Sequence, residues 1–329
     1  MMVDHEHRLV SVPPRRAHRL IGIRLLPAVA TLGNLICGFL AIFCCLLSMR
    51  AEYDVGGPFS VHPRVFNPRL EHLFPTHIAA GAYLIVLAMV FDALDGRLAR
   101  ITRRTSEFGA QLDSLSDIVS FGVAPAALFI TLLLRPEPGT EAMIPDVSRL
   151  QFRIGLGCAL LYMACAAIRL ARYNAENVKT EAAQRAFSGL PSPGAAAAVV
   201  ALLVLHETLR DSEASAGWHV DWANVSRWAI AATAFVVGLL MVSRLDYVHV
   251  FNVYVGRRRP PTHLVWLIGI LALGWYSFEL LLVVLAFAYV FSGLLMYITR
   301  RGRAVAALNP LQAPTAAHDA HSPRRQTGA

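Results

Sequence analysis

Four aspartates lie within one short stretch of an otherwise apolar chain, and their spacing points to chemistry with a metal ion or a proton. The stretch runs from Phe91 to Gly122 and overlaps segments apolar enough to cross a bilayer. A carboxylate at membrane depth is costly unless it is paired, metal-bound or hydrated, so acids there indicate a functional site. The acids are Asp92, Asp95, Asp113 and Asp117, and the small or basic residues between them are Gly96, Ala99, Arg100 and Gly109.

The helical phase of these acids predicts that their carboxylates converge. Asp92 and Asp95 are three residues apart and share one face of a helix. Asp113 and Asp117 are four apart and share a face of the next helix, with Ser120 one turn later on or beside it. The two helices are antiparallel and closely joined, and Asp95 and Asp113 each lie ~7–8 Å from a helix end. One or two hard divalent cations would neutralise such a group, and oxygen ligands favour Mg²⁺, Mn²⁺ or Ca²⁺ over zinc.

The composition indicates an integral membrane protein. Of 329 residues, 56% are hydrophobic and only 16% are charged, with a mean hydropathy of +0.50. Soluble domains carry about 25% charged residues. Runs of about 20 apolar residues recur, and they are continuous, which favours helices over a β-barrel. We predict an all-α, polytopic bundle with about eight transmembrane helices, at 26–49, 77–99, 110–135, 152–172, 190–208, 225–243, 262–278 and 280–299.

The distribution of basic residues predicts the topology. Arginine-rich segments precede the first span and follow the second, fourth, sixth and eighth spans, whereas the alternate loops hold few basic residues. The positive-inside rule therefore places both termini and the aspartates at the cytoplasmic face of the cell membrane. The net charge of +8 is explained by topology and predicts no nucleic-acid partner. We expect a cytoplasmic, partly interfacial arm at 1–25, a membrane-embedded catalytic domain at 26–303 and a disordered cytoplasmic tail at 304–329.

The motif Asp-x2-Asp-Gly-x2-Ala-Arg-x8-Gly-x3-Asp-x3-Asp, from Asp92 to Asp117, resembles the signature of the CDP-alcohol phosphotransferase family. The resemblance implies that family's fold, a cytidine diphosphate-linked lipid donor, an alcohol acceptor and Mg²⁺ or Mn²⁺. It further implies that Asp92, Asp95 and Asp113 are metal ligands. Asp117 would be the general base, with a possible share in the metal. By the same resemblance, the nucleotide and pyrophosphate pocket would be formed by Gly96, Ala99, Arg100 and Gly109.

Three other segments bear on the acceptor alcohol. LPAVATLGNLICGFLAI (26–42), RLARYNAEN (169–177) and FSGLPSPGAA (187–196) resemble the bacterial and archaeal membrane-embedded phosphatidylserine synthases. This resemblance implies transfer of the phosphatidyl group of CDP-diacylglycerol to L-serine with release of CMP. It also implies a homodimer among membrane lipids.

Several roles stay open at this point. Arg169 and Arg172, with Ser120, are candidates for binding the acceptor, while the two arginines fit topology anchors equally well. Thr31 and Asn34 could reach the nucleotide, or could serve helix packing around the neighbouring glycines. Acceptors other than serine, namely glycerol 3-phosphate, inositol phosphate or choline, fit the same motif. A cation transporter is the alternative of a different class, although transport sites usually lie at the bilayer midplane.

Overall fold

The structure is a computed structural model, and it describes seven parts of the chain. These are residues 17–53, 76–102 with 74, 107–135, 150–177, 189–216, 222–245 and, with short gaps, 269–308. All the secondary structure in these parts is helical, as predicted. The helices are α1 (Ala17–Tyr53), α2 (His77–Thr102), α3 (Glu107–Asp117), the π-helical η1 (Ile118–Val123), α4 (Ala124–Leu134), α5 (Leu150–Asn177), α6 (Ser192–Ala216), α7 (Trp222–Val242) and α10 (Phe278–Leu308).

Seven of the described segments are long and apolar enough to cross a membrane, so the protein is a polytopic helical membrane protein. They are Ala28–Arg50, His77–Leu98, Glu107–Leu134, Leu150–Ala175, Ser192–Arg210, Asn224–Val242 and Phe278–Met296. The span predicted at 262–278 lies mostly outside the described residues. At the two ends, α1 begins at Ala17, within the predicted arm, and α10 continues past residue 303 to Leu308.

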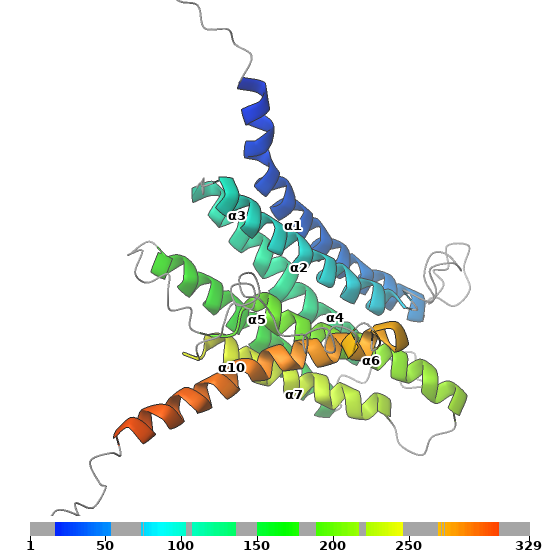
Figure 1. The fold of residues 1–329 in the computed structure, drawn as a ribbon. Coiled ribbons are helices and arrows are strands. Elements are labelled where there is room, and N and C mark those ends of the chain that lie inside the picture. The colour runs from blue at the N-terminus through cyan, green and yellow to red at the C-terminus, as the bar shows by residue number, and fades with distance from the viewer. Residues whose placement is uncertain are drawn as a thin grey trace, which may run out of the picture.

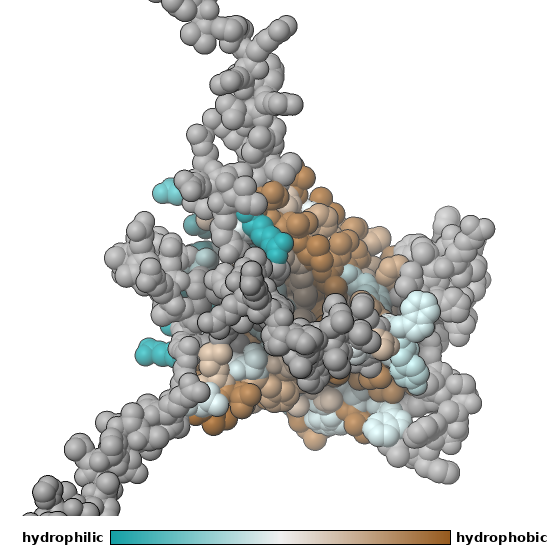
Figure 2. All heavy atoms as spheres, viewed as in Figure 1, coloured by the Kyte–Doolittle hydropathy of each residue, from teal (hydrophilic) through white to brown (hydrophobic). Residues whose placement is uncertain are grey.

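The helices pack around α6, which contacts α2, α4, α7 and α10. Its face is rich in alanine, and Ala195, Ala196 and Ala198 are fully buried, because small residues let helices in a membrane approach closely. Figure 1 shows α1 lying along α2, the most extensive pairing in the bundle. The outward face of α1 is apolar: Val29 and Phe39 are each 63% exposed. Figure 2 shows apolar side chains gathered on the surface of the described helices, as contact with lipid requires.

A π-helical turn divides the span that was predicted as one continuous helix at 110–135. The N–H of Ala124 donates to the carbonyl of Val119, five residues back. Pro125 explains the change, because proline has no N–H to offer the carbonyl of Phe121 four residues earlier. That carbonyl instead accepts a 2.6 Å hydrogen bond from the hydroxyl of Tyr162 on α5, which is fully buried. Single π-helical turns occur frequently at functional sites, and this one begins directly after Asp117.

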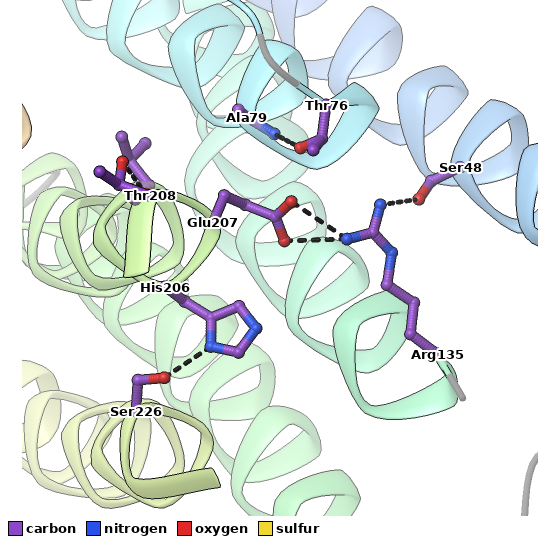
Figure 3. A network of polar contacts seen from close by, with 9 residues as sticks. Ser48, Thr76, Ala79, Arg135, His206, Glu207, Thr208 and Ser226 are labelled. Carbon is purple, nitrogen blue, oxygen red and sulfur yellow. Dashed lines mark hydrogen bonds and ion pairs between the residues drawn. The ribbon is translucent and has the colours of Figure 1, made fainter. Parts of the chain in front are cut away.

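A buried polar network ties the helices together at the opposite end of the spans from the aspartates (Figure 3). Arg135, directly after α4, contacts both carboxylate oxygens of Glu207 on α6, at 2.9 and 3.0 Å. The same guanidinium donates to Ser48 on α1 at 3.0 Å. His206 Nδ1 and Ser226 Oγ are 2.6 Å apart, and this hydrogen bond joins α6 to α7. Arg135 and Glu207 thus balance each other's charge in a buried setting, as a low-dielectric surrounding requires.

Candidate active site

Three aspartates of the motif form one compact group between α2 and α3. One carboxylate oxygen from each of Asp92, Asp95 and Asp113 lies within 4.8 Å of the others. Asp95 is buried and the other two are half-buried. Asp95 Oδ2 and Asp113 Oδ1 are both buried and accept no hydrogen bond from the protein. Buried carboxylate oxygens that lack a donor are costly, so the group fits a hard divalent cation, which prefers oxygen ligands.

Asp117 lies outside this group of three and is held by α1. The side-chain amide of Asn34 donates a 3.1 Å hydrogen bond from Nδ2 to Asp117 Oδ1. Asp92, Asp113 and Asp95 all act electrostatically on Asp117, so it remains a near neighbour of the group. The acids are thus divided into a set of three and a fourth with its own neutral partner.

The seam between α1 and the π-helical turn is unusually close. Ser116 donates to the carbonyl of Thr31 at 3.1 Å, and Ser120 donates to the carbonyl of Asn34 at 2.9 Å. A Cβ added to Gly38 would lie 2.8 Å from the Cα of Ser120, a distance that real Cβ atoms do not adopt. Gly38 therefore permits α1 to pack closely against the π-helical turn that follows Asp117.

This seam contains the residues predicted on or facing α1. Asn34 and Ser120 are 0% exposed, and Asn34 Nδ2 and the Ser120 hydroxyl donate hydrogen bonds within the protein. Asn34 Oδ1 is buried and has no hydrogen-bond partner. Thr31 is 6% exposed, and its side chain hydrogen-bonds to Asp95. Their predicted contacts with a nucleotide or an acceptor stay predictions.

The small residues of the motif leave open space beside the acids. A Cβ added at Gly96 would meet nothing within 4 Å. Gly109 is half-buried near the start of α3. The side chains of Ala99 and Arg100 lie outside the described residues, so their predicted part in the pocket stays a prediction.

Arg169, on α5, also lies close to the aspartates. It donates a 2.6 Å hydrogen bond to Ser192 at the start of α6. Asp117 and Asp92 act on it electrostatically, which places its charge close to the group. Arg172, one turn later, is half-buried. Of the two arginines predicted at the acceptor site, Arg169 is therefore the one with a described contact beside the acids.

A tight turn fixes Ser192 in place. Gly189 has a φ of 98°, and its N–H donates to Leu245 at 2.7 Å. A Cβ at Gly189 would lie 3.0 Å from the carbonyl oxygen of Ser243, so this position requires glycine. Gly189 and Leu190 thus anchor the start of α6 on the end of α7.

An apolar cavity of about 210 Å³ opens between α2, α6 and α10. Met89, Val200 and Leu285 contribute to its walls, together with the ring of Tyr289. Tyr289 also lies near Arg169, so one residue links the apolar cavity to the polar site.

Sequence reasoning missed three features of the site: the π-helical turn, Ser192 and Tyr289. Pro125 was the available signal for the turn. Ser192 lies in a segment that the sequence singled out, but its pairing with Arg169 depends on how α5 and α6 pack. Tyr289 is far along the chain from both Arg169 and Ser192, so no local sequence pattern predicted its place at the site.

Known proteins resemble this chain over the same region. The family described as CDP-alcohol phosphatidyltransferase matches residues 24–240. A CDP-diacylglycerol–serine O-phosphatidyltransferase of Mycobacterium tuberculosis is 30% identical over 197 residues, which is 59% of each chain. A protein of the same description from Methanocaldococcus jannaschii is 34% identical over 165 residues, which is 50% of this chain and 61% of that one. Another from Saccharomyces cerevisiae is 37% identical over 133 residues, which is 39% and 42% respectively. The similarity thus spans less than two thirds of the length of these relatives.

Proposed function

The chain belongs to the CDP-alcohol phosphatidyltransferase family, and on that premise we propose that it transfers the phosphatidyl group of CDP-diacylglycerol to L-serine and releases CMP. The observation that carries this proposal is the division of the acids. Asp92, Asp95 and Asp113 form a cation-sized group, and Asp117 stands beside it on a separate support. The choice of serine is supported by relatives described as CDP-diacylglycerol–serine O-phosphatidyltransferases.

The aspartate group would hold Mg²⁺ or Mn²⁺. Both ions favour carboxylate ligands and commonly bind together with substrate phosphates. Asp92, Asp95 and Asp113 would be the protein ligands, and the two unpartnered oxygens of Asp95 and Asp113 support this assignment. When bound, such a cation neutralises pyrophosphate charge and stabilises the leaving CMP.

The protein side chains would perform the proton transfer and the positioning. Asp117 takes the proton of the serine hydroxyl as its oxygen forms a bond to the phosphorus of the phosphatidyl group. The phosphoanhydride bond to CMP breaks in the same displacement, and CMP carries away the electron pair. Arg169, which lies beside Asp117, would bind the serine carboxylate through a charge-assisted hydrogen bond. Ser192 would hold the guanidinium in that orientation.

The lipid part of the donor would stay among the helices. The apolar cavity at Met89, Val200 and Tyr289 supports an acyl chain close to the polar site. The positive-inside pattern supports an orientation with the acids facing the cytoplasm, in the cell membrane. A homodimer is part of the proposal on family resemblance alone.

Purified enzyme given CDP-diacylglycerol and one labelled acceptor at a time tests this function. We expect labelled lipid and stoichiometric CMP with serine, and neither product with glycerol 3-phosphate, inositol phosphate or choline. A product with one of these and none with serine would overturn the acceptor and keep the family. Activity in detergent, without a sealed compartment, would also separate a transferase from a cation transporter.

A further inference from the structure

We propose that Asn34 is a positioning residue for Asp117: its side-chain amide orients the carboxylate that accepts the proton. This inference rests on the proposed function, because it assigns Asp117 the role of base. Asn34 Nδ2 donates to Asp117 Oδ1 across 3.1 Å, between residues 83 positions apart in the chain. Asn34 is 0% exposed, so it reaches the reaction only through Asp117.

Hydrogen bonds hold the backbone around Asn34 in place. Its carbonyl accepts the hydroxyl of Ser120, and one turn earlier the carbonyl of Thr31 accepts the hydroxyl of Ser116. The close approach at Gly38 adds a steric limit one turn later. With its backbone held and only two side-chain torsions, Asn34 directs its amide at one point. Such a rigid support is what an orienting group requires.

The electrostatic setting gives Asp117 a reason to need this support. Asp92, Asp113 and Asp95 all act unfavourably on its negative charge. The N–H of Asn34 binds Oδ1 and so stabilises the carboxylate without adding a charge to the site. The bond fixes the plane of the carboxylate and so the direction of its other oxygen.

The π-helical turn also helps to position Asp117. It begins at Ile118, directly after Asp117, and contains Ser120. Asp117 and Ser120 contact the side chain and the carbonyl of one residue, Asn34. The turn therefore begins directly after the base, and both Asp117 and the turn are attached to α1 through the same residue.

Two variants of Asn34 test the proposal through CMP release in detergent, with serine and donor each varied. Asn34→Leu keeps the number and branching of the side-chain heavy atoms and removes the donor, and Asn34→Asp keeps the shape and adds a like charge. We expect kcat to fall by roughly 10–100-fold in Asn34→Leu, the scale of an ~1 Å misplacement of a reacting group, and further in Asn34→Asp. The KM for serine and the dissociation constant for CDP-diacylglycerol should stay within about twofold, since Asn34 contacts neither in the proposed geometry.

Ser116→Ala is the matched control, because it loses a hydrogen bond of the same seam that does not reach Asp117. It should lower kcat far less than Asn34→Leu does, because Ser120 still holds the carbonyl of Asn34. Equal losses of kcat in Ser116→Ala and Asn34→Leu would assign Asn34 to the seam alone and overturn the proposal. A rise in the donor dissociation constant as large as the fall in kcat would make Asn34 a nucleotide contact and would also overturn it.

A double-mutant cycle with Asp117→Glu distinguishes positioning from independent effects. If Asn34 acts through Asp117, the two losses in kcat will be strongly non-additive, whereas independent residues give additive losses. Additive losses would sink the proposal. If the parent enzyme releases no CMP with any acceptor, the proposed function fails instead, so the two failures are separable. If the Leu variant does not fold, the same cycle with Asn34→Asp decides.

Discussion

The hydroxyl of Tyr162 on α5 donates a 2.6 Å hydrogen bond to the carbonyl of Phe121, inside the π-helical turn that follows Asp117. Pro125 deprives this carbonyl of its usual α-helical donor, and Phe121 is fully buried, so water cannot replace it. One side chain on α5 thus satisfies the backbone of the turn that begins directly after Asp117.

Tyr162→Phe should destabilise the turn. The variant leaves the carbonyl of Phe121 without a donor, at a cost of ~1–3 kcal/mol for a buried polar group. We expect a lower unfolding midpoint in detergent and a smaller kcat, with donor affinity little changed. The control is Tyr276→Phe, since Tyr276 is 84% exposed. Unchanged stability in Tyr162→Phe would mean that the turn does not depend on this bond.

Gly38→Ala should separate α1 from the π-helical turn. The new methyl would lie 2.8 Å from the Cα of Ser120, which is backbone and cannot rotate away. Overpacking of this kind costs ~1–3 kcal/mol, and the shift of α1 should lower kcat as well. Gly157→Ala is the matched control, because a Cβ there meets nothing within 4 Å. Alanine favours a helix over glycine, so this control should be neutral or slightly stabilising.

The division of the acids predicts two different phenotypes. Asp95→Asn should weaken Mn²⁺ binding, followed by electron paramagnetic resonance, by at least ~10-fold, since even outer-shell changes have that effect. Asp117→Asn should keep Mn²⁺ and donor binding and lose ~10²–10⁴-fold in kcat, the usual share of a general base. Equal loss of Mn²⁺ in both variants would make Asp117 a ligand. Removing the metal with a chelator should stop CMP release reversibly.

The pairing of the acids was predictable from sequence, and the support behind them was not. Asp92 and Asp95, or Asp113 and Asp117, share a face because helical geometry is local. The contacts of Asn34, Ser120 and Arg169 join residues on different helices, so they depend on how those helices pack. For this reason the sequence left two roles open for Asn34, nucleotide binding or helix packing, and did not predict that its amide binds Asp117. Seven of the eight spans predicted from hydrophobicity coincide approximately with described spans, and the eighth, at 262–278, lies mostly outside the described residues.

Arg169 should distinguish serine from an acceptor without a carboxylate. Loss of a charged hydrogen bond costs ~1.5–3 kcal/mol, so Arg169→Ala should raise the KM for serine by roughly 10–100-fold. Turnover with ethanolamine, which lacks the carboxylate, should change far less. Ser192→Ala should show a milder version of the same pattern, because the guanidinium loses its 2.6 Å partner. Equal losses with both acceptors would assign Arg169 to the donor pyrophosphate instead.

The buried pair of Arg135 and Glu207 should stabilise the bundle without taking part in the reaction (Figure 3). Their side chains are 6% and 1% exposed, so Glu207→Leu removes the carboxylate that balances a buried arginine charge. Removing one member of such a pair costs ~3–5 kcal/mol, whereas replacing both with apolar residues is often neutral. We therefore expect a large fall in the unfolding midpoint for Glu207→Leu and substantial recovery in Arg135→Met/Glu207→Leu.

The control is Thr208→Ala, at the exposed neighbouring position on α6, which should leave the unfolding midpoint unchanged. Folded protein should keep its kcat in every case, because this network lies at the opposite end of the spans from Asp117. A double variant as unstable as the single one would show that the network matters through its hydrogen bonds rather than through charge balance.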